Sequence, residues 1–237
     1  KIIGGLEDER IFLNPQNWAV ISGISEEKRC EMAMEEVKKK LITDYGPLLL
    51  FPPFTEIDEK IGYITRYAPG TRENGGVYTH AAVWTLWSSW LRKDYELADR
   101  VYSSLSPILR YYKDPDLYGA EPYVAPGNSD GPLSPRKGRA GWTWYTGSAS
   151  WLYRSLIQYY LGIKPIKEGI LFSPCTQKRW EQATIEFQIR GGKYRLKISN
   201  PEGKALYEFK EIIFNGKRLK GNLIPYSKGE NEILVLY

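Results

Sequence analysis

Apolar residues in the first two thirds of the chain recur at helical spacing. Over 26–41 they form one stripe opposite Lys and Glu side chains. The same pattern predicts helices over 77–91 and 95–112 and a fourth helix over 147–161 that ends at Gly162. The stripe of the first of these helices comprises Cys30, Ala33, Met34, Val37 and Leu41.

Two long segments rich in glycine, proline and aromatic residues, 43–76 and 113–146, separate these helices. Loops of this length are uncommon unless they carry function. Four helices with such connections do not make a bundle with short loops, so we expect the helical part to belong to something larger.

Beyond Lys164 the pattern changes to the alternation typical of strands. Segments 184–189 and 194–198 alternate on either side of Gly191-Gly192, which predicts a hairpin. Further strands are expected over 211–214 and 232–236. We therefore predict a helical domain over 1–163 and a small antiparallel β domain over 164–237.

Composition and charge exclude several classes of protein. The 237 residues include 33 Lys+Arg and 28 Asp+Glu, a net charge of +5, and 14% are aromatic. A disordered chain is poorer in aromatics. The basic runs are short and lie beside acidic residues, so no nucleic-acid partner is expected. No stretch approaches the roughly 18–20 apolar residues of a membrane span. Two cysteines fit a reducing cytoplasm better than a disulfide framework.

The first polar cluster lies in 67–80 and contains Tyr67, Arg72, Glu73 and His80. His80 is the only histidine, so imidazole chemistry must use it. Near a helix start it would lie beside free N–H groups, where an anion is favoured. A hydrogen-bonded core histidine is the simpler alternative, and Arg72 with Glu73 could be an ordinary ion pair.

A second cluster precedes the fourth helix. Thr146, Gly147 and Ser148 lie at its predicted start, where hydroxyl and N–H groups could hold phosphate or could simply cap the helix. Trp142 and Trp144 offer flat faces that suit sugar rings, although they could equally be core residues.

Glu121 lies in a loop, where a carboxylate could bind sugar hydroxyls or remain an ordinary surface group. No carboxylate spacing indicates a paired acid and base. Metal-ligand spacing, a phosphate-binding Gly-Lys-Ser/Thr loop and a nucleotide fingerprint are also missing from the sequence. No metal site or cofactor is therefore expected.

Several of these segments together resemble glycoside hydrolase family 94, which contains the cellobiose and chitobiose phosphorylases. The resemblance covers nearly the whole chain in matching order and extends to the phosphorylase-like region of cyclic β-1,2-glucan synthases. The matching segments are 11–16 (IFLNPQ), 62–67 (GYITRY), 69–76 (PGTRENGG), Thr79-His80, 121–124 (EPYV) and 141–148 (GWTWYTGS).

The resemblance implies an (α/α)6 barrel, of which this chain holds the second half, followed by a small C-terminal antiparallel β-sandwich. It also implies inverting phosphorolysis, in which inorganic phosphate attacks the anomeric carbon and a general acid protonates the leaving oxygen. By the matching motifs, His80 and the Thr146-Gly147 pair would hold phosphate. Arg72 and Glu73 would shape the acceptor-sugar side, with Tyr67 nearby.

Two departures from the family pattern limit what the chain can do. The family's general acid is an Asp in a Trp-Asn-Asp-Gly type motif, which this sequence lacks and which lies upstream in the family. In cellobiose phosphorylases a Gln follows the Glu-Pro-Tyr-Val segment, where this chain has Ala125-Pro126-Gly127. Cellobiose is therefore a doubtful substrate.

We expect this chain to be the C-terminal part of a β-glycoside phosphorylase and to be inactive alone. We also expect it to associate with an N-terminal fragment or subunit, or with itself. Its expected ligands are a β-linked di- or oligosaccharide and inorganic phosphate. Two alternatives remain open: an inverting hydrolase with Glu73 or Glu121 as acid, and a non-catalytic remnant that binds sugars or anions.

Overall fold

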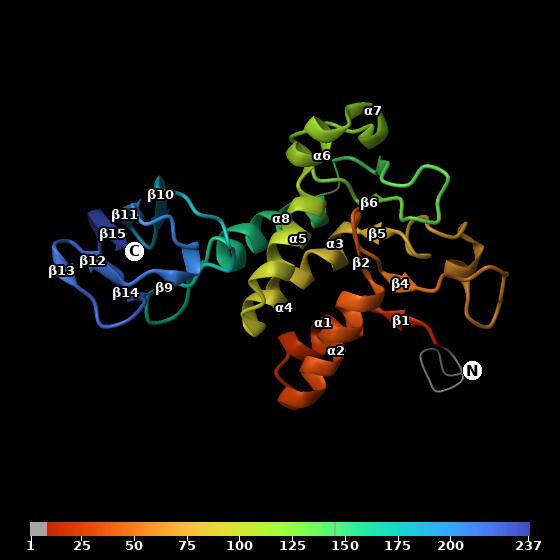
Figure 1. The fold of residues 1–237 in the computed structure, drawn as a ribbon, viewed down its shortest axis with the longest axis horizontal. Helices are drawn as coiled ribbons and strands as arrows, with labels where there is room; N and C mark the ends of the chain where they lie inside the picture. The colour runs from red at the N-terminus through yellow and green to blue at the C-terminus, as the bar shows by residue number, and fades with distance from the viewer. Residues whose placement is uncertain (1–8, 145) are drawn as a thin grey trace. The chain divides into compact units, whose positions relative to one another are not determined.

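The chain divides into two units, the first running to Ser155 and the second comprising Leu156–Tyr237. A computed structural model describes residues 9–144 and 146–237 (Figure 1). The first unit is mainly helical with short paired strands, and the second is built mainly from strands. The change from helix to strand along the sequence is therefore as predicted.

The first unit contains both regular helices and two-residue strands. Among the short strands, β1 pairs with β4, β2 with β3, and β6 lies between β5 and β7. Its helices are α1 (Leu13–Ile21), α2 (Glu27–Lys40), α3 (Thr79–Ala82), α4 (Trp84–Arg92), α5 (Tyr95–Leu105), α6 (Pro107–Lys113), α7 (Pro115–Tyr118), α8 (Thr146–Ser155) and the 3-10 helix η1 (Tyr63–Arg66). Its strands are β1 (Ile11–Phe12), β2 (Ile42–Thr43), β3 (Gly46–Pro47), β4 (Leu50–Phe51), β5 (Val77–Tyr78), β6 (Asn128–Ser129) and β7 (Ala140–Gly141).

The helix predicted over 77–91 begins two residues later, at Thr79, and is interrupted at Val83. Val77 and Tyr78 form β5, because their backbone groups pair with β6 instead of opening a helix. At Val83, which has helical dihedral angles (φ −66°, ψ −22°), the Leu86 N–H bonds to the Val83 carbonyl at 3.1 Å. This tighter turn divides the predicted helix into α3 and α4.

The segment predicted as one helix over 95–112 is also divided in two. Asp94 caps α5, because its carboxylate accepts from the Leu97 N–H at 3.1 Å. Ser106 is extended (ψ 115°), as expected for a residue before proline, and Pro107 then opens α6. The fourth predicted helix is α8, which continues as a π-helical turn, η2 (Leu156–Tyr160).

The sequence pattern missed α1, which packs against both α2 and α4 (Figure 1). Its buried face consists of Leu13, Asn17 and Val20, so a polar residue interrupts the apolar stripe. The Asn17 amide is fully buried and donates to the Thr85 hydroxyl at 3.1 Å. A hydrogen bond to α4 therefore replaces the apolar contact that the pattern requires.

The Arg110 side chain on α6 donates hydrogen bonds to three segments of the first unit. It is buried, and Nη1 donates to the carbonyls of Tyr45 and Ser104 at 3.1 and 3.0 Å. Nη2 donates to the Gly138 carbonyl at 2.7 Å. One guanidinium thus satisfies three backbone acceptors from segments far apart in the sequence.

The second unit contains two sheets. A five-stranded sheet has the order β10-β11-β15-β12-β13, and a three-stranded sheet has the order β14-β9-β8. The strands are β8 (Ile163–Pro165), β9 (Ile170–Phe172), β10 (Gln182–Ile189), β11 (Gly192–Ser199), β12 (Glu211–Phe214), β13 (Lys217–Arg218), β14 (Leu223–Ile224) and β15 (Gly229–Leu236), with the 3-10 turn η3 (Leu206–Glu208).

The predicted hairpin is confirmed, but the description of this region as antiparallel is wrong for one pair of strands. β10 and β11 pair antiparallel across Gly191-Gly192, as the alternation indicates. β15 pairs with β11 in parallel, with Leu196 opposite Ile233. Only strands joined by a tight turn are forced to run antiparallel, and β11 and β15 are separated by several other strands.

Both sheets contribute to one apolar core. Leu196 and Ile233 from the larger sheet are fully buried, as is Ile224 of β14, and Ile170 and Phe172 of β9 are nearly so. The opposite face of the larger sheet is charged, with ion pairs between neighbouring strands such as Arg195 and Glu186 (2.8 Å). Alternation along the strands therefore separates a buried face from a solvated one.

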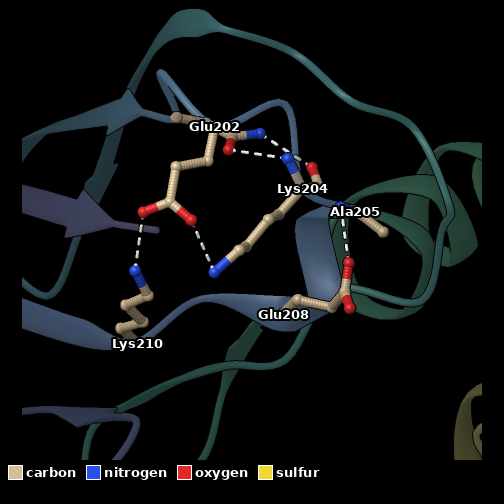
Figure 2. A network of polar contacts seen from close by, with 6 residues as sticks. Glu202, Lys204, Ala205, Glu208 and Lys210 are labelled. Atoms are coloured by element: carbon tan, nitrogen blue, oxygen red, sulfur yellow. Dashed lines mark hydrogen bonds and ion pairs between the residues drawn. The ribbon is translucent and has the colours of Figure 1, made fainter.

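The turn that follows β11 is fixed by polar contacts (Figure 2). Fully buried Asn200 accepts from the Lys204 N–H at 2.9 Å and donates to the Lys204 carbonyl at 2.7 Å. On the exposed side of this turn, Glu202 accepts from the ammonium groups of Lys204 and Lys210 at 2.7 Å each (Figure 2). These hydrogen bonds, that of Lys204 first, lower the pKa of Glu202 to about 2.

Across residues 9–144 and 146–237, none of the helices has the length and apolar character that crossing a membrane would require.

Removing the hydrogen bonds of Arg110 should destabilise the first unit. In Arg110→Met the buried carbonyls of Ser104 and Gly138 and the half-buried one of Tyr45 lose their donor, so we expect the free energy of unfolding to fall by about 3 kcal/mol. Urea denaturation followed by circular dichroism measures this change. Arg100→Met, on the exposed side of α5, is the matched control and should change the value by less than about 0.5 kcal/mol. Equal losses in both variants would contradict the role given to Arg110.

Candidate functional site

The loop that carries Arg72 and Glu73 is held in place by Asn74. The Asn74 side chain is fully buried, and its Oδ1 accepts from the Phe54 N–H at 2.8 Å. Its Nδ2 donates to the carbonyls of Phe54 (2.9 Å) and Tyr67 (2.7 Å). One amide therefore pairs with the backbone of Phe54 much as a neighbouring strand would, and fixes both ends of the loop.

The same loop approaches a second segment too closely for a side chain. Gly70 has φ +84°, and a Cβ at this position would lie 2.4 Å from the Ser134 nitrogen. Its carbonyl accepts from the Gly131 N–H at 2.7 Å. Only glycine fits there, so the sequence Pro69-Gly70 sets the path of the loop toward Arg72.

Arg72 lies between two aromatic rings. Its guanidinium carbon is 4.7 Å from the ring centroid of Tyr67 and 4.8 Å from that of Trp142. The backbone of Arg72 is left-handed (φ +48°), an uncommon conformation for a residue with a side chain. The structure thus brings together three of the residues singled out for the sugar side, and their stacking is a favourable cation–π arrangement.

Glu73 presents a carboxylate oxygen with an unused hydrogen-bonding capacity. Its Oε2 lies 3.5 Å from Arg72 Nε, yet it is buried and makes no hydrogen bond with any described residue. A buried carboxylate oxygen without a donor is costly, so this atom is suited to accept from a ligand hydroxyl.

His80, on α3, lies against the start of α8. A Cβ built on Gly147 would be 3.7 Å from His80 Nδ1, so glycine leaves the backbone of α8 close to the imidazole. His80 is half-buried, and burial lowers its pKa below the ordinary value of 6.5. Ser148 is fully buried. Thr146 opens α8, but its side chain lies outside the described residues, as does Tyr145.

Glu121 and Trp144 form a third group. The Trp144 indole Nε1 donates to Glu121 Oε1 at 3.1 Å, and the Tyr123 ring lies 6.4 Å from the Trp144 ring. Trp144 and Tyr123 are both largely exposed. The chain from Trp142 to Gly147 therefore contributes one residue to each group: Trp142 beside Arg72, Trp144 beside Glu121, and Gly147 beside His80.

The sequence was compared with known proteins and families. The model of the family described as the glycosyl hydrolase 94 superfamily, catalytic domain, matches residues 2–162. The chain belongs to the glycosyl hydrolase 94 superfamily. The resemblance inferred from the motifs is therefore confirmed.

Individual relatives within the glycosyl hydrolase 94 superfamily are similar along most of this chain. Solabiose phosphorylase of Paenibacillus borealis is 34% identical over 219 residues, which are 92% of this chain and 28% of the relative. Cyclic beta-(1,2)-glucan synthase NdvB of Rhizobium meliloti (strain 1021) is 35% identical over 196 residues, 80% of this chain and 7% of the relative. N,N'-diacetylchitobiose phosphorylase of Vibrio proteolyticus is 29% identical over 234 residues, 97% of this chain and 29% of the relative.

The chain spans less than a third of the length of these curated relatives. The matched portion contains all the candidate site residues of this family member, from Tyr67 to Ser148.

Sequence reasoning missed two residues that contact His80. Trp84 and Trp151 have ring centroids 5.2 and 6.0 Å from that of the imidazole. A signal was present, because Trp84 follows His80 by four residues and Trp151 follows Gly147 by four. Residues four apart lie on one helix face, so each indole is placed beside a candidate site residue.

Asn74→Asp should release the loop while keeping its shape and volume. The carboxylate cannot donate to the carbonyls of Phe54 and Tyr67, so we expect the unfolding free energy of this segment to fall by about 2–3 kcal/mol. Native-state hydrogen exchange should show the Gly70 amide, which donates to the Asn74 carbonyl within the loop, losing protection. Gln188→Glu, on an exposed position of β10, introduces the same charge and should leave that amide unchanged. Full protection of the Gly70 amide in Asn74→Asp would refute the assignment.

His80 should titrate below pH 6.5 in the folded chain, because burial disfavours the imidazolium. As the sole histidine, it gives a single set of imidazole signals in proton NMR. Added phosphate should raise this pKa, since a nearby anion favours the protonated ring, whereas chloride at equal ionic strength should not. A midpoint at or above 6.5 without phosphate would contradict the structure.

Proposed function

We propose that this chain supplies the phosphate site and the acceptor-sugar site of an inverting β-glycoside phosphorylase. In the proposed reaction a phosphate oxygen attacks the anomeric carbon of a β-linked glucoside or oligosaccharide. The bond to the leaving sugar oxygen breaks, a general acid gives that oxygen its proton, and an α-sugar 1-phosphate results. Phosphate is then a co-substrate, and no other cofactor is required.

The observation that carries this proposal is the contact between His80 and the start of α8. Gly147 leaves the imidazole facing backbone at the start of a ten-residue helix, where N–H groups have no partner within the helix. His80 makes no hydrogen bond with any described residue, so its ring nitrogens remain available to an anion. A donor-rich pocket of this kind replaces the second carboxylate that an inverting hydrolase needs.

The acceptor side of the proposed site is built from Arg72, Glu73 and the flanking rings. Glu73 Oε2 would accept from a sugar hydroxyl, and Arg72 would donate while Tyr67 and Trp142 hold its plane. Trp144 and Glu121 would line the outer part of this side. The names of the relatives, two phosphorylases and a glucan synthase, support this assignment over a hydrolase.

The general acid is expected on a segment that the relatives carry upstream of the matched region. We propose that residues 1–163 form the second half of an (α/α)6 barrel and that 164–237 form a β-sandwich. An N-terminal fragment or subunit, or a second copy, would complete the barrel. Exposed apolar side chains on the helical unit, among them Leu91 and Ile108, support such an association. A reducing cytoplasm remains the expected location.

Release of sugar 1-phosphate from β-linked disaccharides and β-1,2-glucan tests the proposal. The chain is assayed alone and with the upstream part of the P. borealis solabiose phosphorylase. We expect phosphate-dependent release only in the mixture, because loss of the general acid alone slows the reaction about 10²–10⁴-fold. Release without phosphate would favour a hydrolase, and release by the chain alone would place the acid in this sequence.

Gly147→Ala separates binding from folding in the same assay. The added methyl group would lie 3.7 Å from His80 Nδ1, within the space proposed for phosphate, while alanine favours the helix by up to about 1 kcal/mol. We expect unchanged or higher stability and at least about tenfold weaker use of phosphate. Ala149→Ser, on the exposed face of α8, should behave as the parent chain. Normal phosphate use by Gly147→Ala would overturn the assignment.

A further inference from the structure

The His80 ring is packed between two indoles rather than fixed by a hydrogen bond. Trp84 meets it edge-on, with ring centroids 5.2 Å apart and planes at 63°. Trp151 lies 6.0 Å away and is tilted by 33°. The two indoles also contact each other at 5.9 Å and 88°, so the three rings form a closed triangle.

Each indole is itself braced from outside the triangle. Trp18 on α1 packs edge-on against Trp84 at 5.2 Å, and Trp87 on α4 stacks on Trp151 at 6.2 Å. A charged group also contacts this cluster, because the guanidinium carbon of Arg154 lies 5.3 Å from the ring centroid of Trp151. The triangle is therefore supported by α1, α4 and α8 together.

A histidine that binds a ligand is usually oriented by a hydrogen bond from its other ring nitrogen to a carbonyl or carboxylate. His80 makes no hydrogen bond with any described residue, and Nε1 of Trp84 is buried without a partner as well. Nothing polar in the described part of the chain fixes the imidazole plane, so the ring contacts must do so.

We propose that Trp84 and Trp151 are positioning residues that hold the His80 imidazole, by ring packing alone, in the plane that faces Gly147. This inference rests on the proposed function of His80 as a phosphate ligand. It assigns to two tryptophans the task that a hydrogen-bonded carboxylate performs elsewhere, and it leaves both ring nitrogens free for phosphate oxygens. A ring held in this way needs no reorganisation when the anion binds.

The test uses the imidazole NMR signals of the intact chain during a titration with inorganic phosphate. In the parent chain we expect saturable shifts of these signals. In Trp84→Leu and Trp151→Leu we expect phosphate affinity to fall about three- to tenfold, because the ring must then be ordered on binding. The His80 pKa should rise toward its ordinary value in both, because water reaches the ring. The phenylalanine variants Trp84→Phe and Trp151→Phe should retain most of the affinity.

Trp90→Leu is the matched control, since Trp90 lies on α4, is half-buried, and makes no ring contact with His80 among the described residues. It should bind phosphate as the parent chain does. Circular dichroism identifies any variant that fails to fold, and the leucine variant at the other position then supplies the comparison.

The outcomes separate the two claims. If phosphate leaves the parent signals unmoved, the proposed function of His80 is wrong, and this inference falls with it. If the parent chain binds but both leucine variants bind equally well, with an unchanged His80 pKa, only the positioning role is wrong.

Discussion

The geometry of the candidate site depends on one buried amide. Asn74 bonds to both backbone groups of Phe54 and to the carbonyl of Tyr67, which an amide can do because it accepts at its oxygen and donates twice from its nitrogen. Thr71 to Asn74 form a tight turn closed by a bridge and by a hydrogen bond from the Asn74 N–H to the Thr71 carbonyl at 2.9 Å. The bonds of the Asn74 amide fix where this turn, with Arg72 and Glu73 at its tip, lies. The left-handed backbone of Arg72 belongs to this turn, and its guanidinium lies between two rings.

Two different physical means fix the two halves of the candidate site. On the side proposed for the sugar, hydrogen bonds to the backbone and a stacked guanidinium set the positions of the side chains. On the side proposed for phosphate, helix α8 brings Gly147 to His80, and aromatic rings pack around the imidazole. The segment from Trp142 to Gly147 contributes to both halves, so a change in its path would alter the proposed sugar and phosphate sites together.

How much of this could be predicted from the sequence differs between elements. The stripe of α2 and the hairpin of β10 and β11 follow directly from periodicity. The division of the predicted helix at Pro107 was available from the sequence but was overlooked, whereas α1 was hidden because Asn17 occupies a core position. The role of Asn74 had no local signal, since its partner Phe54 lies twenty residues earlier. The proximity of His80 to Gly147 came from the family resemblance, not from spacing.

The parallel pairing of β11 with β15 has a consequence for how the second unit is made. The hairpin of β10 and β11 can form from local contacts, but its inner edge stays open until β15 arrives from beyond β12, β13 and β14. Such non-local closure is slow compared with hairpin formation. During that interval an open edge and the apolar face of β11 are exposed to other chains. Aggregation of newly synthesised protein is therefore expected to begin at this edge, and slower synthesis would lengthen the exposure.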